Sequence, residues 1–142
     1  MIVPDTNILI YAFNASVPQH RQAASWWEEA VNSGSLIGVP AVVFLSFVRL
    51  LTGRQIVDNP YTAEQLFGLT DEWWERPSVR LLHTTEKTFG LFRTLVEKYN
   101  LSGSATSDAL IAAFVVEHRG LLISNDTDFL RFKEIKVENP FD

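Results

Sequence analysis

Short runs of aliphatic residues alternate along this sequence with longer stretches whose apolar residues recur at helical spacing. This alternation is typical of parallel strands joined by crossover helices. The expected strands are Ile2 to Pro4, Leu36 to Val39, Val79 to Leu82, Leu121 to Ser124 and a short edge strand, Ile135 to Val137. The expected helices are Ile8 to Phe13, His20 to Asn32, Ala41 to Thr52, Thr62 to Glu75, Glu86 to Tyr99 and Thr106 to Arg119. The sequence therefore predicts an α/β fold, a three-layer α/β/α sandwich with a central, mainly parallel, five-stranded sheet.

The size of the chain favours one domain that spans residues 1–142. With 142 residues, 46% of them hydrophobic, it can bury the core of one ordinary domain. The absence of cysteine excludes disulfides, thiolate zinc sites and thiol nucleophiles, and is compatible with a reducing cytoplasm. The first residues are apolar but contain Pro4 and Asp5 and lack a basic leader. We therefore expect neither a signal peptide nor a spanning helix, and a soluble cytoplasmic protein.

The charge balance argues against long-range attraction of a polyanion. The chain carries 17 acidic and 12 basic side chains, a formal net charge of −5, so it has no broad positive field. A nucleic acid would have to be held locally. Bound divalent cations can provide that contact, because they bridge carboxylates to phosphate.

Acidic side chains follow two of the expected strands. Asp5 comes directly after the first strand, and Asp126 and Asp128 follow the strand that begins at Leu121. Asp108 lies in the first turn of a helix that leads into that same strand. In open parallel sheets the ligand site forms beyond the carboxyl ends of the strands. We therefore expect these three distant segments to converge.

Each carboxylate also has a purely structural interpretation. Asp5 fits a turn after which Thr6 or Asn7 caps the following helix. Asp108 fits a first-turn carboxylate that favours the helix dipole, and Asp126 fits the N-cap of a short turn. Calcium buffering is disfavoured, because the tract around Asp126 lacks the glycine and the terminal glutamate of a calcium-binding helix-loop-helix motif.

The convergence of several carboxylates points to a cation. Clustered negative charges repel one another unless a cation neutralises them. Hard oxygen ligands without histidine or cysteine favour Mg²⁺ or Mn²⁺ over zinc. Such a cluster can activate water and offset charge on a phosphodiester during in-line attack. Phosphodiester hydrolysis is therefore the chemistry that this pattern favours.

Taken together, four segments resemble the PIN-domain ribonucleases, and especially the VapC toxins of toxin–antitoxin pairs. The resemblance rests on the opening Val3 to Leu9, the central Pro40 to Val43 leading into Phe47 to Thr52, the helix start Ser107 to Ala113, and Ser124 to Phe129. It implies an RNA substrate, a cognate antitoxin protein and a homodimer. It also implies that the metal-binding carboxylates are Asp5, Asp108 and Asp126, with Asp128 as an auxiliary acid and Thr6 and Ser124 as polar supports.

The sequence departs from that family in the central helix. PIN toxins commonly carry a glutamate at the position of Ser46. Ser46 and Arg49 are i,i+3 neighbours and lie on nearly one face of the helix. This edge is either a strip of solvent contact or a functional pair, in which Ser46 holds metal-bound water and Arg49 contacts phosphate. The missing acid keeps open an alternative, a catalytically impaired PIN-like module that binds RNA or protein.

Two other enzyme classes lack a required group. A phosphotransferase of the haloacid-dehalogenase type needs a second Asp two positions after Asp5, where this sequence has Asn7. A response-regulator receiver needs an Asp after the third strand, where this sequence has His83.

Adjacent tryptophans occur twice, as Trp26-Trp27 and Trp73-Trp74. Neighbours on a helix are separated by about 100°, so we expect one of each pair to face the core.

Overall fold

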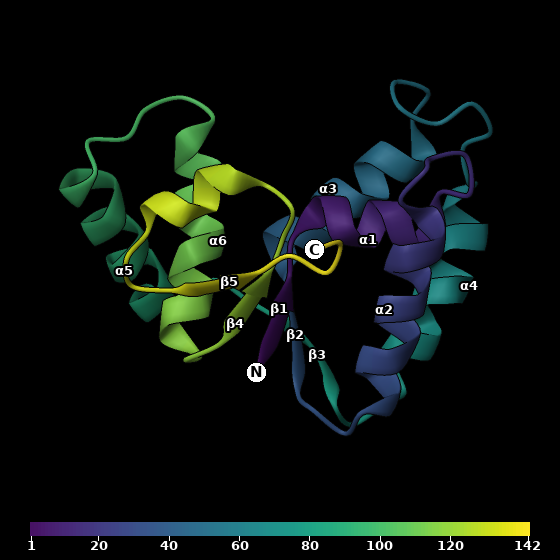
Figure 1. Cartoon of the computed structure of the whole chain (residues 1–142), viewed down its shortest axis with the longest axis horizontal. Helices are drawn as coiled ribbons and strands as arrows, with labels where there is room; N and C mark the ends of the chain where they lie inside the picture. The colour runs from purple at the N-terminus through teal and green to yellow at the C-terminus, as the bar shows by residue number, and fades with distance from the viewer.

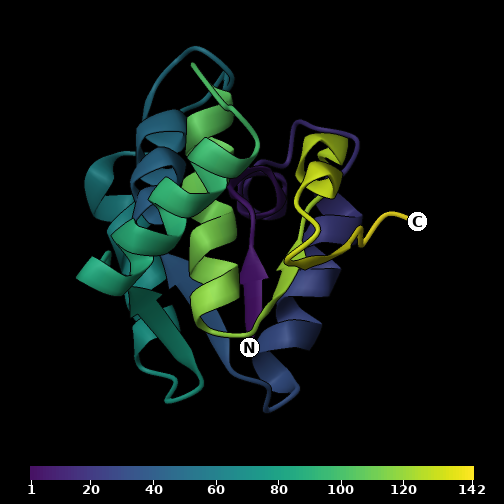
Figure 2. The same cartoon turned by 90° about the vertical axis from the view of Figure 1, so that its left-hand side faces the viewer.

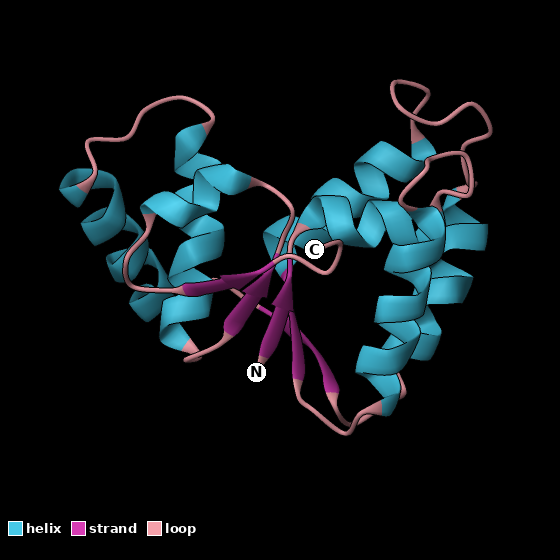
Figure 3. Cartoon of the chain, in the orientation of Figure 1, coloured by secondary structure: helices cyan, strands magenta, loops and turns pink.

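We describe residues 1–142 from a computed structural model. The chain forms one five-stranded sheet of strand order β3-β2-β1-β4-β5, and every neighbouring pair is parallel (Figures 1 and 3). The strands are β1 (Ile2–Pro4), β2 (Ile37–Pro40), β3 (Val79–Leu82), β4 (Leu121–Ile123) and β5 (Lys136–Glu138). The helices are α1 (Thr6–Phe13), α2 (His20–Asn32), α3 (Ala41–Thr52), α4 (Ala63–Trp74), α5 (Glu86–Lys98) and α6 (Ala105–Glu117), with a 3₁₀ helix η1 (Thr127–Arg131).

The helices lie on both sides of the sheet. Figures 1 and 2 show α5 and α6 on one side, and α1, α2 and α4 on the other. The predicted α/β/α sandwich is therefore confirmed, and the sheet is parallel throughout rather than mainly so. None of the helices is long and apolar enough to cross a membrane.

Several predicted boundaries were wrong by one or two residues, and local chemistry explains the clearest cases. The second strand runs from Ile37 to Pro40, because Ile37 pairs with β1 and β3 whereas Leu36 is exposed. Thr62 does not belong to α4 but is its N-cap, and it forms a capping box with Gln65. The fourth strand ends at Ile123, the fifth spans Lys136–Glu138, and α5 and α6 span Glu86–Lys98 and Ala105–Glu117.

The core on the α1–α4 side is built around aromatic rings. Trp73 is buried and contacts the rings of Phe13, Trp27 and Phe47 at centroid distances of 5.4, 4.8 and 5.3 Å. Trp27 is also buried, whereas their sequence neighbours Trp26 and Trp74 are only partly buried. The prediction that one tryptophan of each pair faces the core is confirmed.

Strands β1 and β4 are adjacent in the sheet and place two polar segments side by side. Their paired residues run from Ile2 and Leu121 to Pro4 and Ile123. The backbone N–H of Asp5 then donates to the carbonyl of Ile123 at 2.9 Å. The side chains that follow the two strands are therefore neighbours, and they lie where open parallel sheets place their ligands.

Two glycines lead to opposite stability predictions. A Cβ added at Gly90, inside α5, would have no atom within 4 Å apart from its chain neighbours and the backbone of its own helix, so Gly90→Ala should raise the free energy of unfolding by about 0.5–1 kcal/mol. At Gly120 a Cβ would lie 2.9 Å from the backbone oxygen of Met1. Gly120→Ala should therefore lower the free energy of unfolding by about 1–3 kcal/mol, because β1 or β4 must shift. Urea denaturation of both variants checks the signs, and two equal shifts would contradict this packing.

Candidate active site

Asp5 is a buried carboxylate at the junction of β1 and α1. It is only 5% exposed, and it rather than Thr6 or Asn7 is the N-cap of α1, so the predicted cap was wrong. Its Oδ1 accepts from the backbone N–H of Thr6 at 2.7 Å, and α1 consequently begins two residues earlier than predicted. Burial raises the pKa of Asp5, the hydrogen bonds from Ser124 and Thr6 oppose that rise, and the charge of Asp126 adds to it.

Ser124 joins the two strand ends. Its side chain is buried, and its Oγ donates to Asp5 Oδ2 at 2.8 Å. The same Oγ accepts from the backbone N–H of Asp126 at 3.0 Å. Ser124 thus fixes the orientation of one carboxylate and the start of the loop that carries the next, as a polar support of the site would.

Asp108 projects from the first turn of α6, the helix whose far end leads into β4. It is partly buried, and no hydrogen bond to its carboxylate is present in the structure. Burial, followed by the negative charges of Asp126 and Asp5, raises the pKa of Asp108 to about 6. The helix dipole alone does not explain this residue, because its neighbours make the charged form unfavourable.

Asp126 and Asp128 complete the acidic group. Asp126 is the N-cap of η1, as its structural interpretation predicted, and its Oδ1 accepts from the backbone N–H of Asp128 at 2.9 Å. Asp108, Asp126 and Asp128 each offer an oxygen, and these oxygens lie within 4.8 Å of one another. Asp5 lies outside this tight group but lines the same cleft as Asp108 and Asp126.

Helix α3 also lines the cleft. The cleft has a volume of about 300 Å³ and is lined by residues from β1–α1, α3, α6 and the loop after β4. Ser46 and Arg49 both line it, together with Thr6. None of the ion pairs in the structure involves Arg49, whose side chain is exposed. Both residues of the α3 edge thus line the same cleft as the carboxylates.

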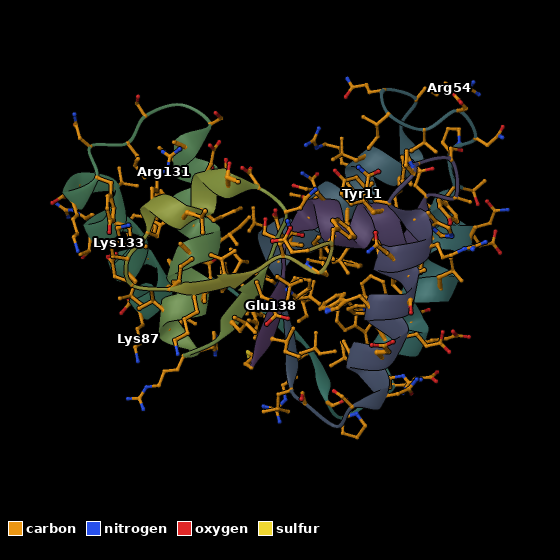
Figure 4. All side chains as sticks on the ribbon, in the orientation of Figure 1. Tyr11, Arg54, Lys87, Arg131, Lys133 and Glu138 are labelled. Atoms are coloured by element: carbon orange, nitrogen blue, oxygen red, sulfur yellow. The ribbon has the colours of Figure 1, made fainter.

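Sequence reasoning missed three polar residues at or near this cleft. Asn7 and Ser107 line it, next to Thr6 and Asp108 respectively. Arg131, on η1, is the cation whose charge lowers the pKa of Asp108 and opposes the effect of the acids. Its Nη2 lies 3.9 Å from Asp128 Oδ1, and Figure 4 labels it on the α6 side of the molecule, opposite Arg54. The i,i+3 spacing of Asp128 and Arg131 was the available signal.

The donor set fits a hard divalent cation. Carboxylate oxygens from three chain segments meet in one cleft, without histidine or sulfur, and the pKa values of Asp5 and Asp108 are raised. Oxygen-only ligands of this kind suit Mg²⁺, Mn²⁺ or Ca²⁺. A cation there would remove the repulsion that the four acids now exert on one another.

The chain matches a known protein family along nearly its whole length. The family model described as the PIN domain matches residues 2–135, nearly the whole chain. The chain belongs to the PIN-domain family. Its curated relatives include ribonuclease VapC33 of Mycobacterium tuberculosis, 32% identical over 140 residues and covering 99% of this chain and 98% of the relative. Ribonuclease VapC37 of the same species is 29% identical and covers 99% and 97%.

Solved structures share the fold of this PIN domain. VapBC2 from Rickettsia felis, bound to a DNA fragment from its promoter, superposes with a TM-score of 0.70 at 21% identity, covering 98% of both chains. VapC20 of Mycobacterium tuberculosis, a toxin that cleaves the sarcin–ricin loop, gives a TM-score of 0.68 at 19% identity, covering 96% of this chain and 99% of the other. At these identities the likeness establishes the fold, and the chemistry must come from the site.

Proposed function

We propose that this PIN domain is a metal-dependent endoribonuclease, the toxin of a VapBC-type toxin–antitoxin system. The observation that carries the proposal is the convergence of Asp5, Asp108 and Asp126 in one cleft that also exposes an unpaired arginine. The names of the relatives, ribonucleases VapC33 and VapC37, support the same assignment. The reaction is hydrolysis, in which water adds across a P–O bond of the RNA backbone.

In this proposal Asp5, Asp108 and Asp126 hold Mg²⁺ or Mn²⁺, and Asp128 is an auxiliary acid. Asp128 is exposed and lies beside Arg131, so it is the least constrained of the four. When bound, the cation supplies an activated water and neutralises charge on the phosphodiester. The carboxylates are held in place for this role by hydrogen bonds. Ser124 donates to one oxygen of Asp5 and accepts from the backbone N–H of Asp126, and the Thr6 N–H donates to the other oxygen of Asp5.

The α3 wall binds the substrate in this proposal. The guanidinium of Arg49 pairs with a phosphate oxygen of RNA, which supplies a positive charge in a chain that is acidic overall. Ser46 is too short to replace a glutamate as a direct ligand, so its hydroxyl hydrogen-bonds water in the cleft. The site consequently has three principal ligands rather than four.

The biological setting is part of the same proposal. VapBC complexes among the structural neighbours, such as that of Rickettsia felis, support a cognate antitoxin as a protein partner. We further propose that the protein acts in the cytoplasm as a homodimer. Co-expression with a neighbouring antitoxin gene, followed by size-exclusion chromatography with light scattering, tests both assemblies.

The catalytic assignment is tested against the alternative of a binding module, which the serine at position 46 favours. Purified protein is incubated with pooled cellular RNA and Mg²⁺ or Mn²⁺, with EDTA and with an Asp126→Asn variant as controls. We expect discrete RNA fragments that require both the metal and Asp126. RNA binding with no fragments under any divalent condition would support the binding module instead.

Replacement of Arg49 should weaken substrate binding more than catalysis. We expect Arg49→Ala to raise KM by about 10-fold or more, because a charge-assisted hydrogen bond to phosphate is lost. Arg49→Lys should recover only part of the loss, since lysine lacks the bidentate fork. Cleavage kinetics of a synthetic RNA over a range of salt concentrations measure this, and the salt dependence of KM should be shallower in Arg49→Ala. An unchanged KM would show that Arg49 contacts solvent rather than the substrate.

A further inference from the structure

A second, smaller pocket adjoins the catalytic cleft on the far side of Asp126. Its volume is about 130 Å³, and it lies between the loop after β4, η1 and the segment that follows β5. Its walls include Asn125, Thr127, Leu130, Val137, Asn139 and Asp142. Asp126 lines both the pocket and the cleft. A molecule that lies over the carboxylates therefore has its next chemical group within reach of this pocket, which we call the Asn125 pocket.

The walls of the Asn125 pocket exclude a phosphate. No lysine or arginine lines it, and two of its residues, Asp126 and Asp142, are carboxylates. A negatively charged group would find repulsion and no counter-ion there. The remaining walls are the amides of Asn125 and Asn139 and the hydroxyls of Ser124 and Thr127, with apolar surface from Val137 and from Leu130, which is 57% exposed. The pocket suits a neutral group with a hydrogen-bonding edge and an apolar face.

Several side chains of the Asn125 pocket have donors or acceptors that make no hydrogen bond within the protein. No side-chain hydrogen bond of the structure involves Asn125, Thr127 or Asp142. Asn139 Oδ1 accepts from the backbone N–H of Phe141 at 2.9 Å, which orients that side chain and leaves its amide N–H groups to donate. The pocket therefore presents amide donors and, at Asp142, a carboxylate acceptor.

We propose that the Asn125 pocket binds an unpaired nucleobase next to the scissile phosphate, and that guanine is the base it prefers. The proposal rests on the endoribonuclease function proposed above. Guanine offers two adjacent N–H donors, N1 and N2, which match the acceptor pair of the Asp142 carboxylate. Its O6 accepts from an asparagine amide, and its face rests on Leu130. Unpaired bases of RNA are read in this way on their Watson–Crick edges.

Sequencing of cleavage ends tests the base preference. Single-stranded RNA with a randomised segment is cut by the wild type in Mg²⁺ or Mn²⁺, and the new ends are sequenced. We expect guanine to be enriched about 5- to 100-fold at one position beside the cut, the discrimination of a well-paired base contact. Asp142→Asn and Asn125→Ala should each reduce that enrichment to less than about 3-fold. Asn59→Ala, an amide in the loop between α3 and α4, should leave it unchanged.

The outcomes separate this inference from the function on which it rests. The same base preference in wild type and both pocket variants, or a preference for a base other than guanine, would overturn it. If the wild type cuts no RNA, the proposed function fails, and a measurement of RNA binding tests whether the pocket prefers guanine. Fluorescence anisotropy then compares hexauridylate with hexamers that carry one guanine, using Asp108→Asn protein. Binding of the guanine-containing RNA at least about 5-fold tighter, lost in Asp142→Asn, supports the pocket, and equal affinities overturn it.

Discussion

Asp108→Asn should lower the rate of RNA cleavage at least about 100-fold in Mg²⁺ or Mn²⁺, since loss of a direct ligand exceeds the 10- to 100-fold cost of losing an outer support. The amide is nearly isosteric but carries no charge, so the variant removes the ligand without opening a cavity. Single-turnover cleavage of a labelled RNA at saturating enzyme measures the chemical step apart from binding.

The matched control for Asp108→Asn is Asp71→Asn, which removes an exposed carboxylate from α4, away from the cleft. Its cleavage rate should stay within about 2-fold of wild type, because surface substitutions outside functional features have small effects. If Asp108→Asn kept a cleavage rate similar to that of Asp71→Asn, Asp108 would not belong to the catalytic site.

Asp108→Asn should also stabilise the folded protein when no metal is bound. The pKa of Asp108 is raised in the folded state from an ordinary 3.8 to about 6, so the folded protein binds this proton more tightly than the unfolded chain does. The resulting stability is present below pH 3.8 and is lost as the pH rises to about 6. In EDTA at pH 7, Asp108→Asn should melt about 2–4 °C above wild type, after a discount for the partial exposure of the group.

Divalent metal should reverse that order of stability. A ligand at 100 times its dissociation constant stabilises the folded state by about 2.7 kcal/mol, and the variant lacks one of the proposed ligands. Thermal melts of both proteins at pH 4 and pH 7, in EDTA and in Mn²⁺, measure the difference. At pH 4 in EDTA the two should melt together. An Asp108→Asn variant that melts below wild type in EDTA at pH 7 would contradict the electrostatic account.

The fold could be predicted because hydrophobic periodicity decides it. Each buried strand is a short aliphatic run, and parallel pairing needs helices between the strands. The boundaries were less predictable, because they depend on caps and pairing partners. Asp5 takes the N-cap position of α1, and Pro40 ends β2 opposite Leu82 of β3. A single sequence does not show which of several neighbouring polar residues becomes the cap of a helix.

The site was predictable only as a gathering of acids at strand ends. That Asp5, Asp108 and Asp126 line one cleft follows from the order of β1 and β4 in the sheet and from α6 leading into β4. Finer placement depended on tertiary contacts. Asp128 offers an oxygen within 4.8 Å of oxygens of Asp108 and Asp126, and Arg131, on η1, lies beside Asp128. The Asn125 pocket needed the segment after β5, which carries no sequence motif.

We propose that carboxylates from three chain segments share divalent cations in one cleft. Anomalous diffraction from crystals soaked in Mn²⁺ locates such an ion without any assay of activity. We expect a peak within coordination distance of Asp108 and Asp126 that disappears in Asp108→Asn crystals. An ordered, empty cleft at a Mn²⁺ concentration that supports RNA cleavage would contradict it.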